Sequence, residues 1–365
     1  MGNKLSYCER RCQICAVSFR VKRIPTPEEQ DAPRGHHAPD AAPPTAALQA
    51  REQNDDAGYD GSLISEEEMK GINTLRCLLQ KPADFVPEEG DEDFERDSSC
   101  FLTDVAVHQG PYIYDSGPFN TVRHGVSEAK ITNDNDNLGG EWGMPFHPAC
   151  FEIFKRVCLK KLGFVNLDGL WRVRDLRGSF EYPMGGSFPA LSVRQYAFED
   201  ETWHHKPGTE YLAANPVDIP GFQELLKHLS DPENTSKEPS PQIASQPHTA
   251  IASSEVDIFS VLPPELLTEI LWNLSAKDIA KLRLASRSFR ALPQILFKHL
   301  IRTEMPYFWE IEELDPRGTN WAELYRLLRR DGSSGLLGLR NRVRIWYEAE
   351  EIVEMIRETN LGLAH

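Results

Sequence analysis

A polar segment divides this chain and argues against one continuous hydrophobic core. Residues 231–255 (DPENTSKEPSPQIASQPHTAIASSE) contain no aromatic residue and are rich in proline, serine and threonine. Such a segment buries too little apolar surface to offset the entropy lost on ordering it. We therefore predict that it is a flexible linker. The chain before it, residues 1–230, and the chain after it are then expected to form separate domains.

The region before the linker is predicted to be an α+β domain. Residues 101–107 alternate roughly as a strand does, and residues 149–162 carry apolar side chains at helical spacing, with lysines in the last turn. Residues 25–56 are rich in proline, alanine and charge and lack aromatic residues, which predicts a disordered insertion. A second acidic stretch, residues 87–97, is predicted to be a solvated loop, with its one phenylalanine as an anchor.

The overall composition narrows the class of partner and the compartment. The net charge of −16 disfavours binding along nucleic-acid phosphates. The sequence has no run of about 18 apolar residues that would span a bilayer, and its start lacks the apolar stretch of a secretory signal. Seven cysteines are an odd number at low density, unlike the disulfide framework of a secreted protein. These features predict a reduced cytoplasmic or nuclear protein.

After the linker, the pattern predicts a small all-α domain. Apolar residues recur every four positions, at Leu262, Leu266, Ile270 and Leu274, and Leu267 and Leu271 widen the stripe. Pro264 suits the first position of a helix, where a missing N–H costs nothing. Ser275 begins an S-x-x-D capping box for a second helix, and residues 286–292 form a third, short turn that Pro293 ends. We predict a three-helix domain over residues 257–300 and a helical segment over residues 301–365.

The apolar stripe of the first helix is broader than helices this short can cover. Leu267 and Leu271 lie beside the inward-facing positions, so part of the apolar surface is expected to remain open. An uncovered apolar face marks a binding site for a partner. The alternative is that the three helices serve only as a small core.

The ordered pattern LPPELLTEILWNLSAKDIAKLRLASRSFRAL resembles an F-box. F-box helices dock on a Skp-type adaptor, which links the protein to a cullin–RING ubiquitin ligase. The resemblance implies a non-catalytic substrate-recognition subunit of an SCF-type ligase, with an unknown protein substrate. It places adaptor-facing or face-shaping residues at Leu262, Pro263, Leu267, Ile270, Leu271, Leu274, Ile279 and Leu282. Many F-boxes close with a tryptophan after the third helix, whereas Phe297 stands near that place here and Trp309 comes later.

Other pieces of the chain resemble filamentous-fungal F-box proteins with a long N-terminal region. These pieces are CQIC at 12–15, GYDGSLISEEEMKG at 58–71, FHPACFEIFKR at 146–156 and LRNRVRIW at 339–346. Such kinship does not identify a substrate. We find no residue constellation that argues for catalysis. The alternative to a ligase subunit is a protein-interaction scaffold, stabilised by zinc and tethered to a membrane.

Two short motifs at distant positions predict a structural zinc site. Cys12 and Cys15 form a C-x₂-C pair, and His147 and Cys150 form an H-x₂-C pair. Tetrahedral zinc takes four nitrogen or sulfur ligands, and four protein ligands leave no open position for catalysis. Cys8 and Cys100 are competing ligands. The alternative is that the cysteines are small buried apolar residues and that His147 caps a helix.

The first residues match the N-myristoylation pattern M-G-x-x-x-[ST], with Gly2 as the acceptor. Cys8 and nearby arginines and lysines would supply a second membrane signal, since one acyl chain alone anchors only marginally. Membrane-peripheral localisation is expected if Gly2 is acylated, and the alternative is an unmodified terminus. At the other end, residues 336–357 are predicted to form an amphipathic helix that packs on the preceding helices.

Overall fold

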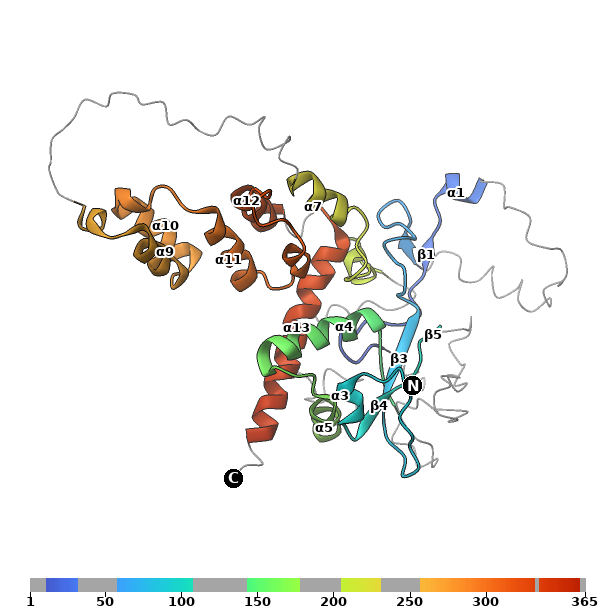
Figure 1. The fold of residues 1–365 in the computed structure, drawn as a ribbon. Helices are drawn as coiled ribbons and strands as arrows, with labels where there is room; N and C mark the ends of the chain where they lie inside the picture. The colour runs from blue at the N-terminus through green and yellow to red at the C-terminus, as the bar shows by residue number, and fades with distance from the viewer. Residues whose placement is uncertain are drawn as a thin grey trace, which may run out of the picture. The chain divides into compact units, whose positions relative to one another are not determined.

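The computed structural model describes residues 11–31, 58–107, 143–177, 205–230, 257–331 and 335–361 (Figure 1). It confirms the predicted class, an α+β N-terminal region with helices in the later part of the chain. The described residues form two compact units. The first unit lies within Met1–Pro220 and Leu337–His365, and the second lies within Gly221–Leu336. The C-terminal end therefore belongs with the N-terminal region and does not continue a separate segment from residue 301.

Several predicted features fall outside the described residues. These are Gly2, Cys8, the linker at 231–255 and most of the insertion predicted at 25–56. Among the described residues, no helix combines the length and apolar character needed to cross a membrane.

The centre of the first unit is strand β3 (Thr74–Gln80). It pairs antiparallel with β4 (Cys100–Leu102), β5 (Ala106–Val107) and β6 (Met144–Phe146). The strand predicted over residues 101–107 is therefore present as two pieces. Between them, the Thr103 hydroxyl accepts a hydrogen bond from the Cys77 amide at 2.9 Å, and the Thr103 amide donates to the Cys77 carbonyl. This side-chain contact replaces one rung of the ladder.

Three helices pack together in the first unit. They are α4 (Pro148–Leu162), α5 (Leu167–Arg177) and α13 (Leu337–Leu361), and α13 also contacts the short helix η2 (Glu210–Leu212) (Figure 1). The predicted helices over 149–162 and 336–357 are confirmed in position. As predicted, the last helix packs on helices that precede it, and these are α4 and α5, which lie far earlier in the chain.

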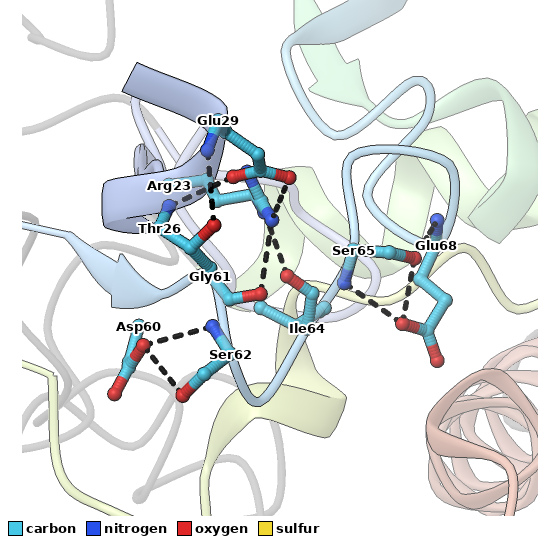
Figure 2. Close-up of polar contacts among 9 residues, drawn as sticks. All are labelled: Arg23, Thr26, Glu29, Asp60, Gly61, Ser62, Ile64, Ser65 and Glu68. Carbon is cyan, nitrogen blue, oxygen red and sulfur yellow. Dashed lines mark hydrogen bonds and ion pairs between the residues drawn. The ribbon is translucent and has the colours of Figure 1, made fainter. Parts of the chain in front are cut away.

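The start of the predicted disordered insertion is ordered. Strand β1 (Arg23–Ile24) pairs with β2 (Tyr59–Asp60), and helix α1 (Pro27–Asp31) follows it. The Arg23 guanidinium donates to both carboxylate oxygens of Glu29 at 2.7 and 2.8 Å, and also to the carbonyls of Ile64 and Gly61 (Figure 2). A half-buried arginine thus joins α1 to the 59–68 loop. The composition of residues 25–56 could not predict this contact, because the arginine that makes it lies just before the stretch.

The acidic stretch at 87–97 also contains a short helix, α3 (Asp93–Arg96). Its first turn is a capping box between Glu92 and Glu95. Arg96 donates to the backbone carbonyls of Asp91, Glu88 and Glu89 and so holds the preceding loop. The prediction of a plain solvated loop is therefore wrong for these residues.

The second unit is helical. Its elements are α7 (Phe222–Ser230), η3 (Ile258–Val261), α9 (Pro264–Trp272), α10 (Ala276–Ala285), η4 (Arg287–Phe289), α11 (Gln294–Glu304), η5 (Trp309–Glu312) and α12 (Trp321–Asp331). Ser275 caps α10 as predicted, because its side chain accepts a hydrogen bond from the Asp278 amide. The short turn predicted over residues 286–292 is present as η4. Pro293 follows it and occupies the N-cap of α11, a longer helix that was not predicted.

Candidate metal centre and partner-binding surface

The structure brings together the four residues predicted as metal ligands. One ligand atom from each of Cys12, Cys15, His147 and Cys150 lies within 4.8 Å of the others, and all four residues are buried. Cys100 is not among them, and Cys8 lies outside the described residues. We call this group the metal centre.

A tight turn presents the first two ligands. Arg11 and Ser18 face each other across an isolated antiparallel bridge, and the Cys12 amide donates to the Val17 carbonyl at 2.9 Å. Ala16 closes the turn with φ of +62°, a conformation that residues other than glycine seldom adopt. The Cys15 amide points at Cys12 Sγ at 3.5 Å. The turn therefore aims both thiols inward and directs a backbone N–H at a sulfur.

The start of helix α4 presents the other two ligands. His147 is the N-cap residue and Pro148 follows at the first helical position, which places Cys150 in the first turn on the same side. The His147 side chain makes no capping hydrogen bond, so the alternative role as a helix cap is not seen. Instead, His147 Nε2 lies 2.8 Å from the Ile72 carbonyl oxygen, while Nδ1 lies 3.5 Å from Cys15 Sγ and 3.7 Å from Cys150 Sγ.

The donor set and its spacing fit a zinc ion. Tetrahedral Zn²⁺ with Zn–S bonds of about 2.3 Å and Zn–N bonds of about 2.0 Å places its ligand atoms roughly 3.5–3.8 Å apart. The S···N distances of 3.5 and 3.7 Å at His147 match that separation. The carbonyl of Ile72 accepts from Nε2–H and leaves Nδ1 free to bind, which is the usual support for a ligating histidine. The cluster is therefore compatible with zinc held by three thiolates and one imidazole.

Within the cluster, His147 and Cys15 stabilise opposite charges on each other. Burial favours a neutral imidazole, but the nearby Cys12 and Cys15 outweigh burial and raise the pKa of His147 to about 10. Burial likewise favours a neutral Cys15, yet hydrogen bonds from Cys12 and Cys150 and the charge on His147 hold the Cys15 pKa well below its ordinary value. A metal ion needs thiolates and a neutral imidazole. Binding it would therefore replace the imidazole proton as the positive charge beside the sulfurs.

Helix α13 supports the centre from behind through a buried polar network. Arg344 donates to the Cys15 carbonyl at 2.9 Å, to Glu348 Oε1 at 3.0 Å and to Asn341 Oδ1 at 2.8 Å. Asn341 in turn donates to the carbonyls of Leu212 and Ala214. The last helix is thus fixed to the turn that carries the first two ligands.

The second candidate site is the exposed apolar surface of the second unit. Of the residues predicted to face an adaptor, Leu271 and Ile279 are buried in the core, Pro263 is exposed, and the others, Leu262, Leu267, Ile270, Leu274 and Leu282, are half-buried. The most exposed large apolar side chains were not predicted. They are Ile258, Val261, Leu266, Trp272, Leu284 and Ile295, of which Leu284 is 91% exposed. We call these six residues the open apolar surface.

The position of Leu284 in the sequence already indicates that its side chain is exposed. Ile279 and Leu282 define the inward stripe of α10, and Leu284 falls outside it at a position where a polar residue would be expected. An apolar residue on the outward face of an amphipathic helix therefore indicates an exposed apolar surface. The resemblance to an F-box gives Leu271 and Ile279 among the adaptor-facing or face-shaping residues, and both are buried.

Comparison with known families bears directly on this unit. A family model described as F-box-like matches residues 259–303. These residues form an F-box-like domain. The match runs from within η3 to within α11 and includes every residue of the open apolar surface except Ile258. No curated protein and no solved structure matches the chain. The resemblance to a filamentous-fungal type therefore stays a prediction.

Asp257 closes the F-box-like domain at its start. Its carboxylate accepts hydrogen bonds from the Phe259 amide at 3.1 Å, the Ser286 hydroxyl at 2.7 Å and the Ser288 amide at 3.0 Å. The Ser286 hydroxyl and these other donors lower the pKa of Asp257 to about 2. The contact connects η3 to η4, which lies after two intervening helices.

We expect Asp257→Ala to lower the thermal midpoint of the F-box-like domain at neutral pH. The folded-state pKa is below the unfolded value of about 3.9, so the carboxylate contributes stability above pH 4, and this contribution is lost as the pH falls toward 2. The difference in midpoint between the variant and the wild type should narrow over that range, as followed by circular dichroism. A constant difference down to pH 2 would contradict the role of the charge.

Proposed function

We propose that this chain is a substrate-recognition subunit of an SCF-type cullin–RING ubiquitin ligase and binds a Skp-type adaptor through residues 259–303. The observation that supports this proposal most directly is the F-box-like match over a domain that leaves large apolar side chains exposed. Exposed apolar surface of this kind serves protein–protein contact. The cullin is reached through the adaptor, and no nucleic acid is involved.

In this proposal the two units have separate tasks. The F-box-like domain connects the chain to the ligase, and the first unit presents a protein target. Ubiquitin transfer belongs to other subunits, so the chain needs no active site of its own. We further propose that the metal centre holds a structural zinc ion, and that the protein works in the cytoplasm or the nucleus.

Replacing Leu284 with glutamate is expected to abolish binding of the Skp-type adaptor. The side chain is 91% exposed, so the substitution should leave the fold intact while placing a charge in an apolar interface. Desolvating that charge costs several kcal/mol, equivalent to at least about a hundredfold in Kd. The measurement is titration calorimetry of the purified chain with the adaptor.

Leu63→Glu provides the matched control, because Leu63 is 55% exposed in the first unit. It should bind the adaptor like the wild type. Unchanged binding by Leu284→Glu would show that Leu284 is not part of the adaptor-binding surface. Failure of the wild-type chain to bind any Skp-type adaptor would rule out the ligase function itself.

The second candidate function is a protein-interaction scaffold that does not serve a ligase. The feature that favours it is the first unit, in which the metal centre and a buried polar network fix both ends of the chain to each other. Membrane attachment in this case depends on acylation of Gly2. Mass spectrometry of the native N-terminus tests that attachment, and an unacylated terminus would leave a scaffold without a tether.

A further inference from the structure

The first unit contains an open groove that neither the metal centre nor the F-box-like domain uses. It lies between α3 and the turn that joins α4 to α5, and its volume is about 410 Å³. The residues that matter for its chemistry are Asp93, Phe94, Asp97, Leu159, Phe164 and Asp168. We call it the α3 groove.

The floor of the groove is apolar and accessible. Helix α4 ends at Gly163, whose φ of +84° reverses the chain and leaves Phe164 56% exposed. Leu159, in the last turn of α4, is 54% exposed. Phe94 is half-buried and contacts Phe151 with the ring centres 6.3 Å apart. Two large exposed side chains beside a fixed aromatic ring form a surface that a partner's apolar side chain can cover.

The rim of the groove is acidic. Asp93 and Asp97 form no ion pair with any described residue, and both are exposed. Asp168 is held in place, because its Oδ1 accepts from the Ser98 hydroxyl at 2.9 Å and the Ser99 amide at 2.8 Å. A carboxylate that is already oriented is well suited to bind a cation.

Among the described residues that line the groove, none is basic and able to neutralise these carboxylates. The nearest cations in sequence have other partners. Arg96 donates to backbone carbonyls. Lys155 lies over the ring of Phe94, with Nζ 5.8 Å from the ring centre, but pairs with Glu92 at 3.2 Å and with Glu152 at 3.0 Å. The groove therefore has an apolar floor and a negative rim, and the cation nearest its floor is already paired with other carboxylates.

We propose that the α3 groove binds a short peptide segment of a target protein in which a lysine or arginine adjoins a large apolar residue. The apolar side chain covers Phe164 and Leu159, and the cation lies near Asp93 and Asp97. This assignment rests on the proposed function, since it gives the substrate-recognition subunit a class of target. Attraction between exposed charges is screened by salt, so binding weakens as ionic strength rises.

The test is selection from a random peptide library displayed on phage, with the intact full-length chain as bait. We expect enrichment of sequences in which a basic residue lies beside an aromatic or aliphatic one. The top sequence, labelled with fluorescein, is then titrated by fluorescence polarisation. Phe164→Ala should weaken its binding about tenfold. Asp93→Asn with Asp97→Asn should weaken it about threefold and flatten its salt dependence.

Matched controls come from exposed residues of the same unit that do not line the groove. Leu63→Ala removes an apolar side chain as exposed as Phe164, and Asp84→Asn with Asp104→Asn removes the same charge. Both controls should bind like the wild type. Absence of enrichment, enrichment of acidic sequences, or binding unaffected by Phe164→Ala would overturn the proposal.

Two further measurements separate the remaining outcomes. Sedimentation that shows a dimer dissociated by Phe164→Ala would overturn the proposal, because the groove would then be an interface between two copies of the chain. Adaptor binding is measured on the same preparations. Peptide binding without adaptor binding removes the ligase function and keeps the groove as a peptide site. Adaptor binding without peptide binding removes the groove and keeps the ligase function.

Discussion

Replacing Cys15 with alanine is expected to eliminate zinc binding and to unfold much of the first unit. The substitution leaves three ligands and opens the centre, and structural zinc sites supply apparent free energies of about 10–16 kcal/mol to the folds that depend on them. Cys15 also lies in the turn whose carbonyl accepts from Arg344, so the loss should reach helix α13. We expect stoichiometric zinc in the purified wild type and none in the variant, by plasma mass spectrometry.

Cys158→Ala is the matched control for this substitution. Cys158 is equally buried, lies in the same helix as Cys150 and is not one of the four clustered residues. It should lose about 0.5–3 kcal/mol of stability, as ordinary core substitutions do, and keep its zinc. If both variants keep zinc, or if the wild type contains none, the metal centre is only a set of buried cysteines. Calorimetry should show a lower midpoint for Cys15→Ala than for Cys158→Ala.

The ligand set was predictable from the sequence because each half carries its own local geometry. A C-x₂-C pair is shaped by one tight turn, and an H-x₂-C pair by the first turn of a helix. That the two halves meet was inferred from their matching ligand spacing, but neither half shows how the fold brings them together. Their meeting depends on the pairing of β6 with β3, which places His147 beside the Ile72 carbonyl. The turn that carries Cys12 and Cys15 is held against β6, because the Gln13 amide donates to the Pro145 carbonyl at 2.9 Å. A contact between residues more than one hundred positions apart produces no repeating pattern in the sequence from which it could be predicted.

The position of α13 shows the same limit for the fold. Its apolar pattern gave a helix close to the observed Leu337–Leu361, but an apolar stripe does not specify which surface covers it. The partner is chosen by polar residues within the helix. Arg342, which is fully buried, donates to the carbonyls of Pro216 and Val217, and Asn341 donates to those of Leu212 and Ala214. The arginines of LRNRVRIW would be expected on a solvent-exposed face from sequence alone, and only the structure shows that Arg342 and Arg344 are buried against carbonyl acceptors.

In the F-box-like domain, local signals were reliable for helix starts and unreliable for exposure. Pro264 and Ser275 mark the first helical residue of α9 and the cap of α10, because capping is decided by adjacent backbone groups. Whether Leu271 is core or interface depends on α11, which packs against α9. The predicted third element, residues 286–292, is the short helix η4, whereas α11 was not predicted, so the helix that covers Leu271 could not be recognised from the sequence.

Replacing Arg344 with methionine is expected to destabilise the first unit by about 3–5 kcal/mol. The side chains of Arg344 and Glu348 are 3% and 1% exposed, and removing the arginine leaves a buried carboxylate without its 3.0 Å counter-charge. Burial opposes the charge on Arg344, but Glu348 and the thiols of the metal centre outweigh it and raise the Arg344 pKa above its ordinary value. Hydrogen exchange of β3 and α4 amides measures the change within this unit.

Arg357→Met is the matched control on the same helix, since Arg357 pairs with Glu354 at the surface, where both side chains are about half exposed. It should cost no more than about 0.5 kcal/mol. The double variant Arg344→Met with Glu348→Met distinguishes the cause, because it also removes the carboxylate that loses its ion pair with Arg344, and it should recover part of the stability. Equal losses for the single and double variants would show that the arginine acts through the Cys15 and Asn341 contacts instead. Zinc affinity should then fall in both, since the turn that carries Cys12 and Cys15 would lose its support from α13.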